Sequence, residues 1–338
     1  MTASIAQAPT VLDDAIVRNA EATLETVGRA REAIHTVIFG QEDVVDLTLI
    51  TLLSGGHGLL VGVPGLAKTK LVETLGSVLG LDARRVQFTP DLMPSDILGS
   101  EILDEGADRR RSFRFVKGPI FTQLLMADEI NRASPRTQSA LLQAMQEHHV
   151  SVGGERHDLP QPFHVLATQN PIEQEGTYPL PEAQLDRFLL EIDVGYPSRD
   201  AERRILIETT GVADAKPSAV MNADALMNAQ RLVRRLPVGE SVVQAILDLV
   251  RSARPEGESL PGVTDKLLWG PGPRASQSLM LAVRARALIE GRVAPSVADV
   301  VALAEPVLKH RMALTFAARA DGETITGVIG RLTERLRG

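Results

Sequence analysis

One octet of the chain contains the residue types that bind phosphate. It lies between a short apolar run and a helical pattern, and it consists of Gly62, Val63, Pro64, Gly65, Leu66, Ala67, Lys68 and Thr69. Glycines let backbone N–H groups close around a phosphate at a helix N-terminus, while Lys68 can reach the outer phosphates and the Thr69 hydroxyl can hold Mg²⁺. Ala67 departs from the general pattern, which has glycine there. A purely structural strand-to-helix turn is the alternative.

Adjacent carboxylates at Asp128 and Glu129 end another apolar run, Leu124 to Ala127. Asp128 would hold Mg²⁺ through its water shell, and Glu129 would orient and deprotonate a water beside the outer phosphate. A helix-capping acid pair is the alternative, but burial of charge without a partner is costly. Together the two motifs predict a site for ATP and Mg²⁺.

The order of motifs along the chain resembles the MoxR family of AAA+ ATPases. The resemblance covers most of the chain and rests on the octet and on four further segments, which are residues 88–96, 128–133, 168–171 and 178–188. It implies an α/β fold with an AAA+ P-loop core, a five-stranded parallel sheet with helices on both faces and inserted β-hairpins. A smaller all-α lid domain should follow this core.

The resemblance also assigns roles to polar residues outside the two motifs. Asn170 matches the first sensor, which contacts the attacking water or outer phosphate, and a turn Asn before Pro171 is the alternative. Arg187 matches the arginine finger that enters the neighbouring subunit's nucleotide site, with a surface salt bridge as the alternative. Arg274 matches the second sensor, in its own subunit or across the interface, with a solvated helix-end arginine as the alternative.

The resemblance also places the adenine base near Phe39 and Gly40, where apolar side chains could cover it. Phe39 as an ordinary core residue is the alternative, since large apolar side chains are mostly buried for packing. The seven histidines, including His148 and His149, show no convincing metal spacing and are interpreted as structural or solvated.

The elements that must position these residues follow from hydrophobic patterning. Short apolar runs predict buried strands at residues 59–61, 85–88, 124–127, 163–167 and 189–194. Helical patterns separate them, as in Lys68 to Leu79 and in the segment that Ser134 and Pro135 open, so the sheet should be parallel. An amphipathic helix is expected over Leu12 to Ile38.

Two segments between these strands have the pattern of β-hairpins. Residues 150–157 alternate around Gly153-Gly154, and residues 102–116 alternate after a polar turn around Gly106. The second of these is locally basic and carries Arg109, Arg110, Arg111 and Arg114, with Lys117 next to it. We hypothesise that both hairpins act on a protein client rather than on nucleic acid. The basic first hairpin is suited to an acidic protein surface, and a solvated charged loop is the alternative.

After Tyr196 no further strand signal appears. Helices are predicted at residues 200–209, 224–236, 241–252, 274–289 and 297–309. The predicted division is therefore a flexible tail over residues 1–11, a nucleotide-binding core over residues 12–197 and a helical lid over residues 198–338.

Composition excludes several classes of protein. A formal net charge of −7 and a pI near 5.6 give no overall attraction to nucleic acid, and zero cysteines exclude disulfides and thiolate metal sites. No membrane span or secretory signal is expected, so the cytoplasm is the predicted location.

By resemblance, the expected function is that of a homo-oligomeric motor, a hexameric ring, that matures or remodels protein clients. Proteins with von Willebrand factor A domains or bound metals are candidate clients. A motor subunit of a magnesium-chelatase-like complex is one alternative. A non-hydrolysing ATP-binding scaffold is another, opposed by the intact Lys68, Glu129 and Arg187. A transcription activator lacks support because there is no helix-turn-helix segment or basic DNA-binding face.

Overall fold

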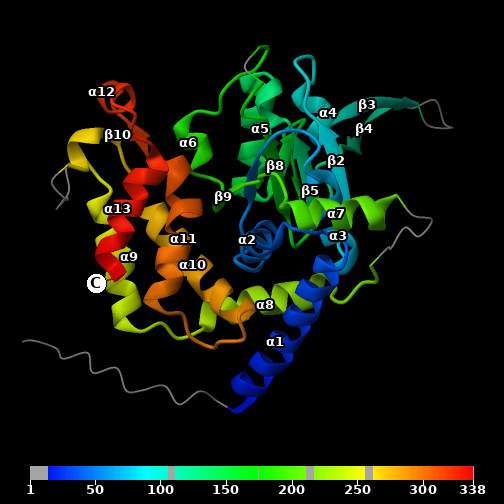
Figure 1. The fold of residues 1–338 in the computed structure, drawn as a ribbon. Coiled ribbons are helices and arrows are strands. Elements are labelled where there is room, and N and C mark those ends of the chain that lie inside the picture. The colour runs from blue at the N-terminus through cyan, green and yellow to red at the C-terminus, as the bar shows by residue number, and fades with distance from the viewer. Residues whose placement is uncertain (1–13, 106–110, 174, 211–216, 256–261, 338) are drawn as a thin grey trace, which may run out of the picture.

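The computed structural model describes residues 14–105, 111–173, 175–210, 217–255 and 262–337. Its centre is a five-stranded parallel sheet with the order β2-β5-β8-β1-β9 (Figure 1). The strands are β1 (Gly58–Val61), β2 (Ala83–Gln87), β5 (Leu124–Asp128), β8 (His164–Gln169) and β9 (Leu190–Asp193). Each coincides with one of the five predicted apolar runs, so the predicted parallel sheet is confirmed.

The strand order brings the polar motifs to one edge of the sheet. Strand β8 pairs with β1 on one side and with β5 on the other, and Val61 lies opposite Gln169. Because parallel strands end at the same edge, the residues that follow β1, β5 and β8 come together there. These residues include the phosphate octet, the Asp128-Glu129 pair and Asn170.

Strand β2 corrects one prediction. It was expected to be buried, but its side chains are largely exposed because it is an edge strand that pairs only with β5 within the sheet. Its polar residues Arg85 and Gln87 are thereby free to face the site at the strand ends, as described below.

Two apolar layers cover the two faces of the sheet, since neighbouring residues of a strand point to opposite sides. Leu60, Met126 and Leu166 face α1 (Asp14–His35), α2 (Glu42–Leu53) and α3 (Lys68–Val78). Leu125 and Val165 face a separate cluster with α4 (Pro94–Leu98) and α5 (Pro135–Glu147). Ser134 caps α5 by accepting a hydrogen bond from the Thr137 N–H, as the Ser-Pro pair predicted.

Both predicted hairpins are confirmed. The first consists of β3 (Gly99–Glu105) and β4 (Arg111–Lys117), and the second of β6 (His149–Val152) and β7 (Glu155–Asp158). Gly153 and Gly154 turn the second hairpin with φ of +61° and +85°, values that favour glycine. The hairpins touch where Phe115 stacks on His157, with ring centroids 4.0 Å apart. The turn around Gly106, with Arg109 and Arg110, lies outside the described residues.

The C-terminal part is mainly helical, as predicted, and its helices stand beside the sheet in Figure 1. The predicted helices are α7 (Arg199–Thr209), α8 (Ala223–Arg235), α9 (Glu240–Ser252), α10 (Pro273–Ile289) and α11 (Val297–Leu308). Short elements of the described chain include α6 (Glu182–Leu185) between β8 and β9. The 3-10 turn η3 (Lys309–Arg311) and α12 (Phe316–Ala320) follow α11. The long helix α13 (Ile325–Arg337) ends the described chain.

The expectation of no strand after Tyr196 is wrong. β10 (Leu267–Trp269) and β11 (Ala313–Leu314) form a small antiparallel pair within the lid. Strands this short show no alternation of polar and apolar residues that a sequence pattern could reveal. The division at residues 197 and 198 stays a prediction, because one apolar core contains residues from both sides of it.

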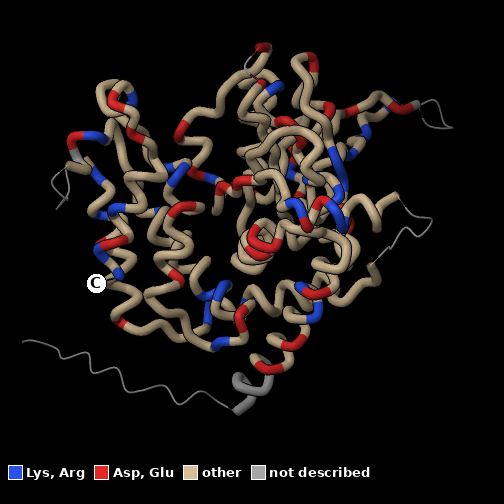
Figure 2. Tube along the Cα trace, viewed as in Figure 1, with Lys and Arg blue, Asp and Glu red and all other residues tan. Residues whose placement is uncertain are grey.

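Acidic and basic residues are interspersed along both the sheet region and the lid in Figure 2, and the acidic residues are in excess, with a formal net charge of −7. Among the helices of the described ranges, the structure contains none with the length and apolar character needed to cross a bilayer.

Candidate active site

The phosphate octet forms the connection between β1 and α3, and it borders a cavity of about 460 Å³ at the carboxyl edge of the sheet. The cavity brings together most of the predicted site residues with several polar neighbours. Its lining consists of Pro64, Gly65, Leu66, Ala67, Lys68, Thr69, Lys70, Arg85, Gln87, Asp128, Glu129, Thr168 and Asn170.

The backbone of the octet explains why small residues occur in it. A Cβ atom at Gly62 would lie 2.5 Å from the carbonyl oxygen of Val194, so no larger residue fits there. Gly65 has φ of +84°, a left-handed value. Ala67, where the general pattern has glycine, has φ of +57°, a conformation that costs a residue with a Cβ roughly 1–2 kcal/mol. The loop shape is therefore retained at Ala67 despite the substitution.

Lys68 lies at the start of α3 with its ammonium turned back into the octet. Its Nζ donates a hydrogen bond to the Gly62 carbonyl at 2.5 Å. Burial lowers the pKa of Lys68, and the nearby carboxylates of Asp128 and Glu129 oppose that shift. The cation thus lies between the loop and the acid pair, where the outer phosphates of a nucleotide would be neutralised.

Asp128 is buried at 8% exposure and has two partners. The Thr168 hydroxyl donates to its Oδ1 at 2.6 Å, and the Arg85 guanidinium contacts its Oδ2 at 2.6 Å. Asp128 is paired, as expected for a buried carboxylate. Its partner Arg85 was not predicted from the sequence. Only the pairing of β2 with β5 reveals this contact, because the residues are far apart in the chain.

Glu129 follows Asp128 in a left-handed conformation, with φ of +55°. Its N–H donates to the Thr168 hydroxyl at 2.8 Å. Its Oε2 accepts hydrogen bonds from Gln87 Nε2 at 2.7 Å and from Arg132 Nη1 at 3.0 Å. Thr168 therefore joins both carboxylate residues to β8, while Gln87 and Arg132 hold the Glu129 side chain at the cavity wall. Sequence reasoning had singled out none of these three partners.

Asn170 lines the same cavity and also forms a turn. Its Oδ1 accepts from the Ile172 N–H at 3.2 Å, and its Nδ2 donates to Glu173 at 3.4 Å. Asn170 thus lines the cavity, as a sensor would, and also makes the hydrogen bond of a turn Asn. Its contact with water or phosphate stays a prediction.

The donor set suits Mg²⁺ held jointly with a nucleotide. Thr69 and Asp128 both line the cavity and would provide oxygen ligands. Among the described residues no cluster of three or more His, Cys, Asp or Glu could hold a metal on its own. Mg²⁺ commonly takes one or two protein ligands and completes its shell with phosphates and waters, so the two residues fit the ion.

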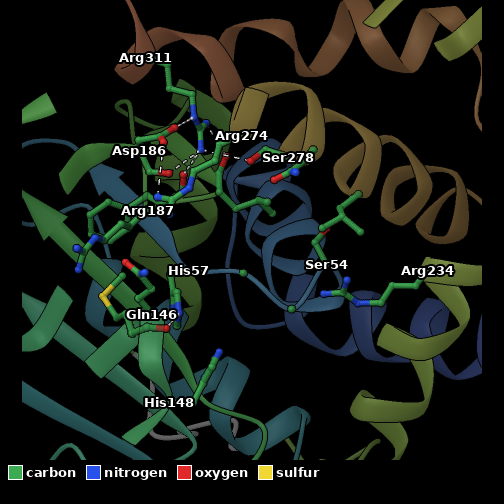
Figure 3. A pocket seen from close by; sticks show the side chains of 17 residues that line it. Ser54, His57, Gln146, His148, Asp186, Arg187, Arg234, Arg274, Ser278 and Arg311 are labelled. Atoms are coloured by element: carbon green, nitrogen blue, oxygen red, sulfur yellow. Dashed lines mark hydrogen bonds and ion pairs between the residues drawn. The ribbon is translucent and has the colours of Figure 1, made fainter. Parts of the chain in front are cut away.

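Arg187 and Arg274 lie in a second cavity of about 430 Å³, apart from the phosphate octet (Figure 3). Arg187 follows α6, and Arg274 lies in the first turn of α10. Four arginines line this cavity, namely Arg187, Arg234, Arg274 and Arg311, together with one acid, Asp186. Arg274 is ion-paired with Asp186 at 3.6 Å. Such a surplus of positive charge is suited to binding an anion.

The two predicted adenine contacts line neither of these cavities. The Arg204 guanidinium of α7 covers the Phe39 ring at 4.4 Å. A Cβ atom at Gly40 would meet the Ala201 side chain at 2.2 Å, so α7 packs closely on this segment. The adenine assignment stays a prediction.

Comparison with known proteins connects this geometry to a family. Residues 57–190 match the family described as ATPase family associated with various cellular activities (AAA), and residues 263–329 match the AAA lid domain. The first match spans the strands and polar motifs of the site, and the second spans the region of α10 and α11.

Relatives and a solved structure extend the similarity to nearly the whole chain. The chain is 43% identical to "Chaperone MoxR1" of Mycobacterium tuberculosis, over 93% of this chain and 82% of that protein. It is 32% identical to "Protein MoxR" of Paracoccus denitrificans, over 88% of this chain and 91% of that protein. A crystal structure from Cytophaga hutchinsonii, of a protein proposed to be an ATPase, superimposes with a TM-score of 0.87 at 33% identity. The superposition covers 95% of this chain and 97% of that chain.

Proposed function

Since this chain belongs to the MoxR family of AAA+ ATPases, we propose that it hydrolyses ATP with Mg²⁺ and uses the energy to remodel protein partners. The proposed hydrolysis rests on one observation. The same cavity is lined by Lys68, Thr69, Asp128 and Glu129. It combines a phosphate-binding cation, two Mg²⁺ ligands and a carboxylate base, which are the parts that hydrolysis of a phosphoanhydride requires.

Each residue has a distinct role in the proposed reaction. The octet amides and Lys68 bind the phosphates; Thr69 and Asp128 would hold Mg²⁺, which would neutralise charge on the phosphate oxygens. Glu129 accepts a proton from the attacking water, while Asn170 orients that water. The bond between the outer phosphate and its bridging oxygen breaks as water adds, and ADP and inorganic phosphate are the products.

The proposal assigns Arg187 and Arg274 to the neighbouring subunit's nucleotide. Both lie in the second cavity, whereas the octet and the acid pair lie in the first. The sequence alone is compatible with action of Arg274 in its own subunit or across the interface. The position of Arg274 beside Asp186 and Arg187 supports action across the interface. Assembly into a closed ring, with a hexamer as the proposed size, would then complete every active site.

The remodelling role rests on family membership and on the name of a relative, "Chaperone MoxR1". Clients with von Willebrand factor A domains or bound metals are proposed on the same basis. A magnesium-chelatase-like motor shares the hairpin-bearing core and is the alternative; recovery of the client by pull-down would distinguish them. A non-hydrolysing scaffold is the further alternative, and the next experiment tests it directly.

The decisive experiment compares two substitutions in the first cavity. Glu129→Gln keeps the hydrogen-bonding shape but removes the base, so we expect it to bind ATP normally and to release phosphate at least about 10²-fold more slowly. Lys68→Ala should lose ATP affinity, because the cation meets the phosphates in the ground state. Phosphate release and equilibrium binding of a fluorescent ATP analogue measure the two effects.

Glu73→Gln is the matched control, since Glu73 is an exposed acid on α3 below the octet. It makes the same change of charge as Glu129→Gln, but on the helix that begins with Lys68, and it should leave both quantities unchanged. Wild-type turnover in the Glu129→Gln protein would eliminate Glu129 as the base. Absence of phosphate release from the assembled wild-type protein would favour the scaffold instead.

A further inference from the structure

A buried cation of the lid contacts the segment that carries Arg187. Arg311 lies in η3, directly after α11, and its side chain is 2% exposed. Arginine is almost never fully buried unless its charge is paired and its donors are satisfied. The partners of this guanidinium therefore indicate what its burial stabilises.

The partners of Arg311 are concentrated on the residues around Arg187 (Figure 3). Its Nε donates to the Asp186 carboxylate at 2.7 Å. Its Nη2 donates to the carbonyls of Asp186 at 3.2 Å and Phe188 at 2.6 Å, and its Nη1 donates to the carbonyl of Leu189 at 3.2 Å. One rigid, planar group thus fixes the backbone immediately before and after Arg187.

Further contacts join the same group to the lid and to Arg274. Arg311 Nη1 donates to the Val307 carbonyl at 2.5 Å, and Nη2 contacts Ser278 Oγ of α10 at 3.3 Å. The neighbouring His310 contacts the Phe188 carbonyl at 3.1 Å. Arg274 pairs with the other carboxylate oxygen of Asp186. Asp186 is therefore a bridge between Arg311 and the proposed second sensor.

We propose that Arg311 is a positioning residue for catalysis, which holds Arg187 in the orientation needed at the neighbouring subunit's ATP. The inference rests on the proposed action of Arg187 across the interface. Because Arg311 also contacts α10 and α11, the direction of Arg187 follows the position of the lid. Arg311 does not line the first cavity, and its guanidinium is buried and bonded to protein groups, so its influence passes through the Asp186 to Leu189 backbone.

Arg311→Lys tests the proposal with the charge retained. Lysine cannot reproduce the planar set of donors, so the segment around Arg187 should lose its fixed position. Misplacement of a catalytic group by about 1 Å can cost roughly 10²-fold in rate, and we expect turnover to fall by at least about tenfold. Nucleotide affinity and ring size should stay unchanged, because the first cavity is intact.

Arg292→Lys is the matched control. Arg292 is another lid arginine, bonded to the buried carboxylate of Asp299 at 2.7 Å, and it also contacts Glu290 and the Ala294 carbonyl, which lie outside the Arg187 segment. It should lower the stability of the lid while leaving turnover within about twofold. If Arg311→Lys does not fold, Asp186→Ala is the second variant, for which we expect a smaller loss of turnover in the same direction.

Mixed rings distinguish positioning from general damage. An Arg311→Lys subunit should have a sound ATP site but a misplaced finger, whereas a Glu129→Gln subunit has the opposite defect. The mixture should therefore turn over faster than the sum of the two separate rates. A mixture of Arg311→Lys with Arg187→Ala should show no such gain, since neither subunit supplies a correctly placed Arg187.

The mixture of Arg187→Ala with Glu129→Gln tests the underlying proposal. A gain in that mixture, without one in the Arg311→Lys and Glu129→Gln mixture, would overturn the role of Arg311 alone. No gain in either mixture would overturn action across the interface, and the positioning role with it. Full turnover in folded Arg311→Lys rings would also contradict the inference.

Discussion

At the scale of single residues, two buried histidines lie where the sheet meets the lid. His57 Nδ1 accepts a hydrogen bond from the Val165 N–H at 2.9 Å, and its Nε2 contacts the Met145 carbonyl at 3.2 Å. His164 Nδ1 contacts the Gly56 carbonyl at 2.8 Å, and its Nε2 contacts Gln230 Nε2 of α8 at 3.0 Å. Each ring therefore uses one nitrogen as donor and the other as acceptor, which requires the neutral form.

These histidines should make the free energy of unfolding depend on pH. Burial lowers the pKa of His57 to about 3 and of His164 to about 4. In the unfolded chain both titrate near pH 6.5, so below that pH the unfolded state binds more protons and stability falls as pH falls. Each histidine should contribute about 1.4 kcal/mol per pH unit between about pH 6 and pH 4. Urea unfolding at pH 8, 6 and 5 measures the slope.

His164→Gln should unfold more easily at pH 8, because its packing and hydrogen bonds are altered, but its stability should fall less steeply with acid. An equal slope in wild type and His164→Gln would exclude His164 as a source of the pH dependence.

The proposed catalytic residues illustrate what single residues reveal before a structure is known. Lys68, Asp128 and Glu129 could be singled out because their types and spacing are specific to phosphate and Mg²⁺ chemistry. Arg85 and Thr168 could not, because arginine and threonine are common in strands. Their contacts with Asp128 depend on β2 and β8 both pairing with β5, and local sequence does not specify strand order.

At the scale of elements, the first hairpin exposes an apolar pair. Leu103 is 55% exposed and Phe113 is 72% exposed, and they lie opposite each other across β3 and β4. Cross-strand partners share one face of a hairpin, so the pair forms a small apolar surface on the face that also carries Arg111. Arg114 lies on the opposite face, where it is ion-paired with Asp104 at 2.9 Å. This arrangement supports contact with a protein client, where apolar anchors contribute most of the affinity.

Replacement of Leu103 and Phe113 by serine should weaken client binding without harming basal ATPase. In a Glu129→Gln background, which should retain clients, we expect the yield of co-purified partner to fall at least about fivefold. Basal turnover of the double serine variant alone should stay within about twofold, because exposed substitutions rarely disturb the core.

Leu268→Ser is the control for this experiment, since Leu268 is 63% exposed on β10 of the lid. Undiminished recovery in the Leu103 and Phe113 variant would place the client surface elsewhere. Stimulation of the wild-type ATPase by DNA or RNA at physiological salt would also contradict a protein client.

Elements differed in how far the sequence could predict them. The hairpin at Gly153-Gly154 has alternation and a glycine turn, so both its strands were predicted. β10 and β11 have neither signal, and they form because the folded lid brings Leu267 to Leu314. β2 was predicted as a strand but not as an exposed one, because its place at the sheet edge is set by topology.

At the scale of the whole molecule, the separation of the two cavities predicts that activity depends on assembly. Arg187 and the phosphate octet line different cavities of the chain, so if Arg187 has its proposed role a monomer should lack one catalytic cation. Turnover per subunit should rise with protein concentration as rings form. Arg187→Ala should assemble and bind ATP but hydrolyse it roughly 10³-fold more slowly, as for other arginine fingers.

Sedimentation and phosphate release over the same range of concentration check this dependence. Arg335→Ala, which removes an exposed cation of α13, should behave as wild type. A turnover rate that is independent of concentration in a protein shown to be monomeric would refute the shared active site.

The apolar core that runs from the N-terminal helices into the lid constrains how such a protein can diverge. Leu49 and Leu52 of α2 belong to the same buried cluster as Leu279 and Val283 of α10. A lid acquired from another gene by recombination would meet helices shaped for a different partner. The first hairpin exposes Leu103 and Phe113 on its two strands, so substitutions there should cost little folding free energy. Evolution of new specificities should therefore proceed by sequence drift in the hairpins, while lid and N-terminal helices are inherited together.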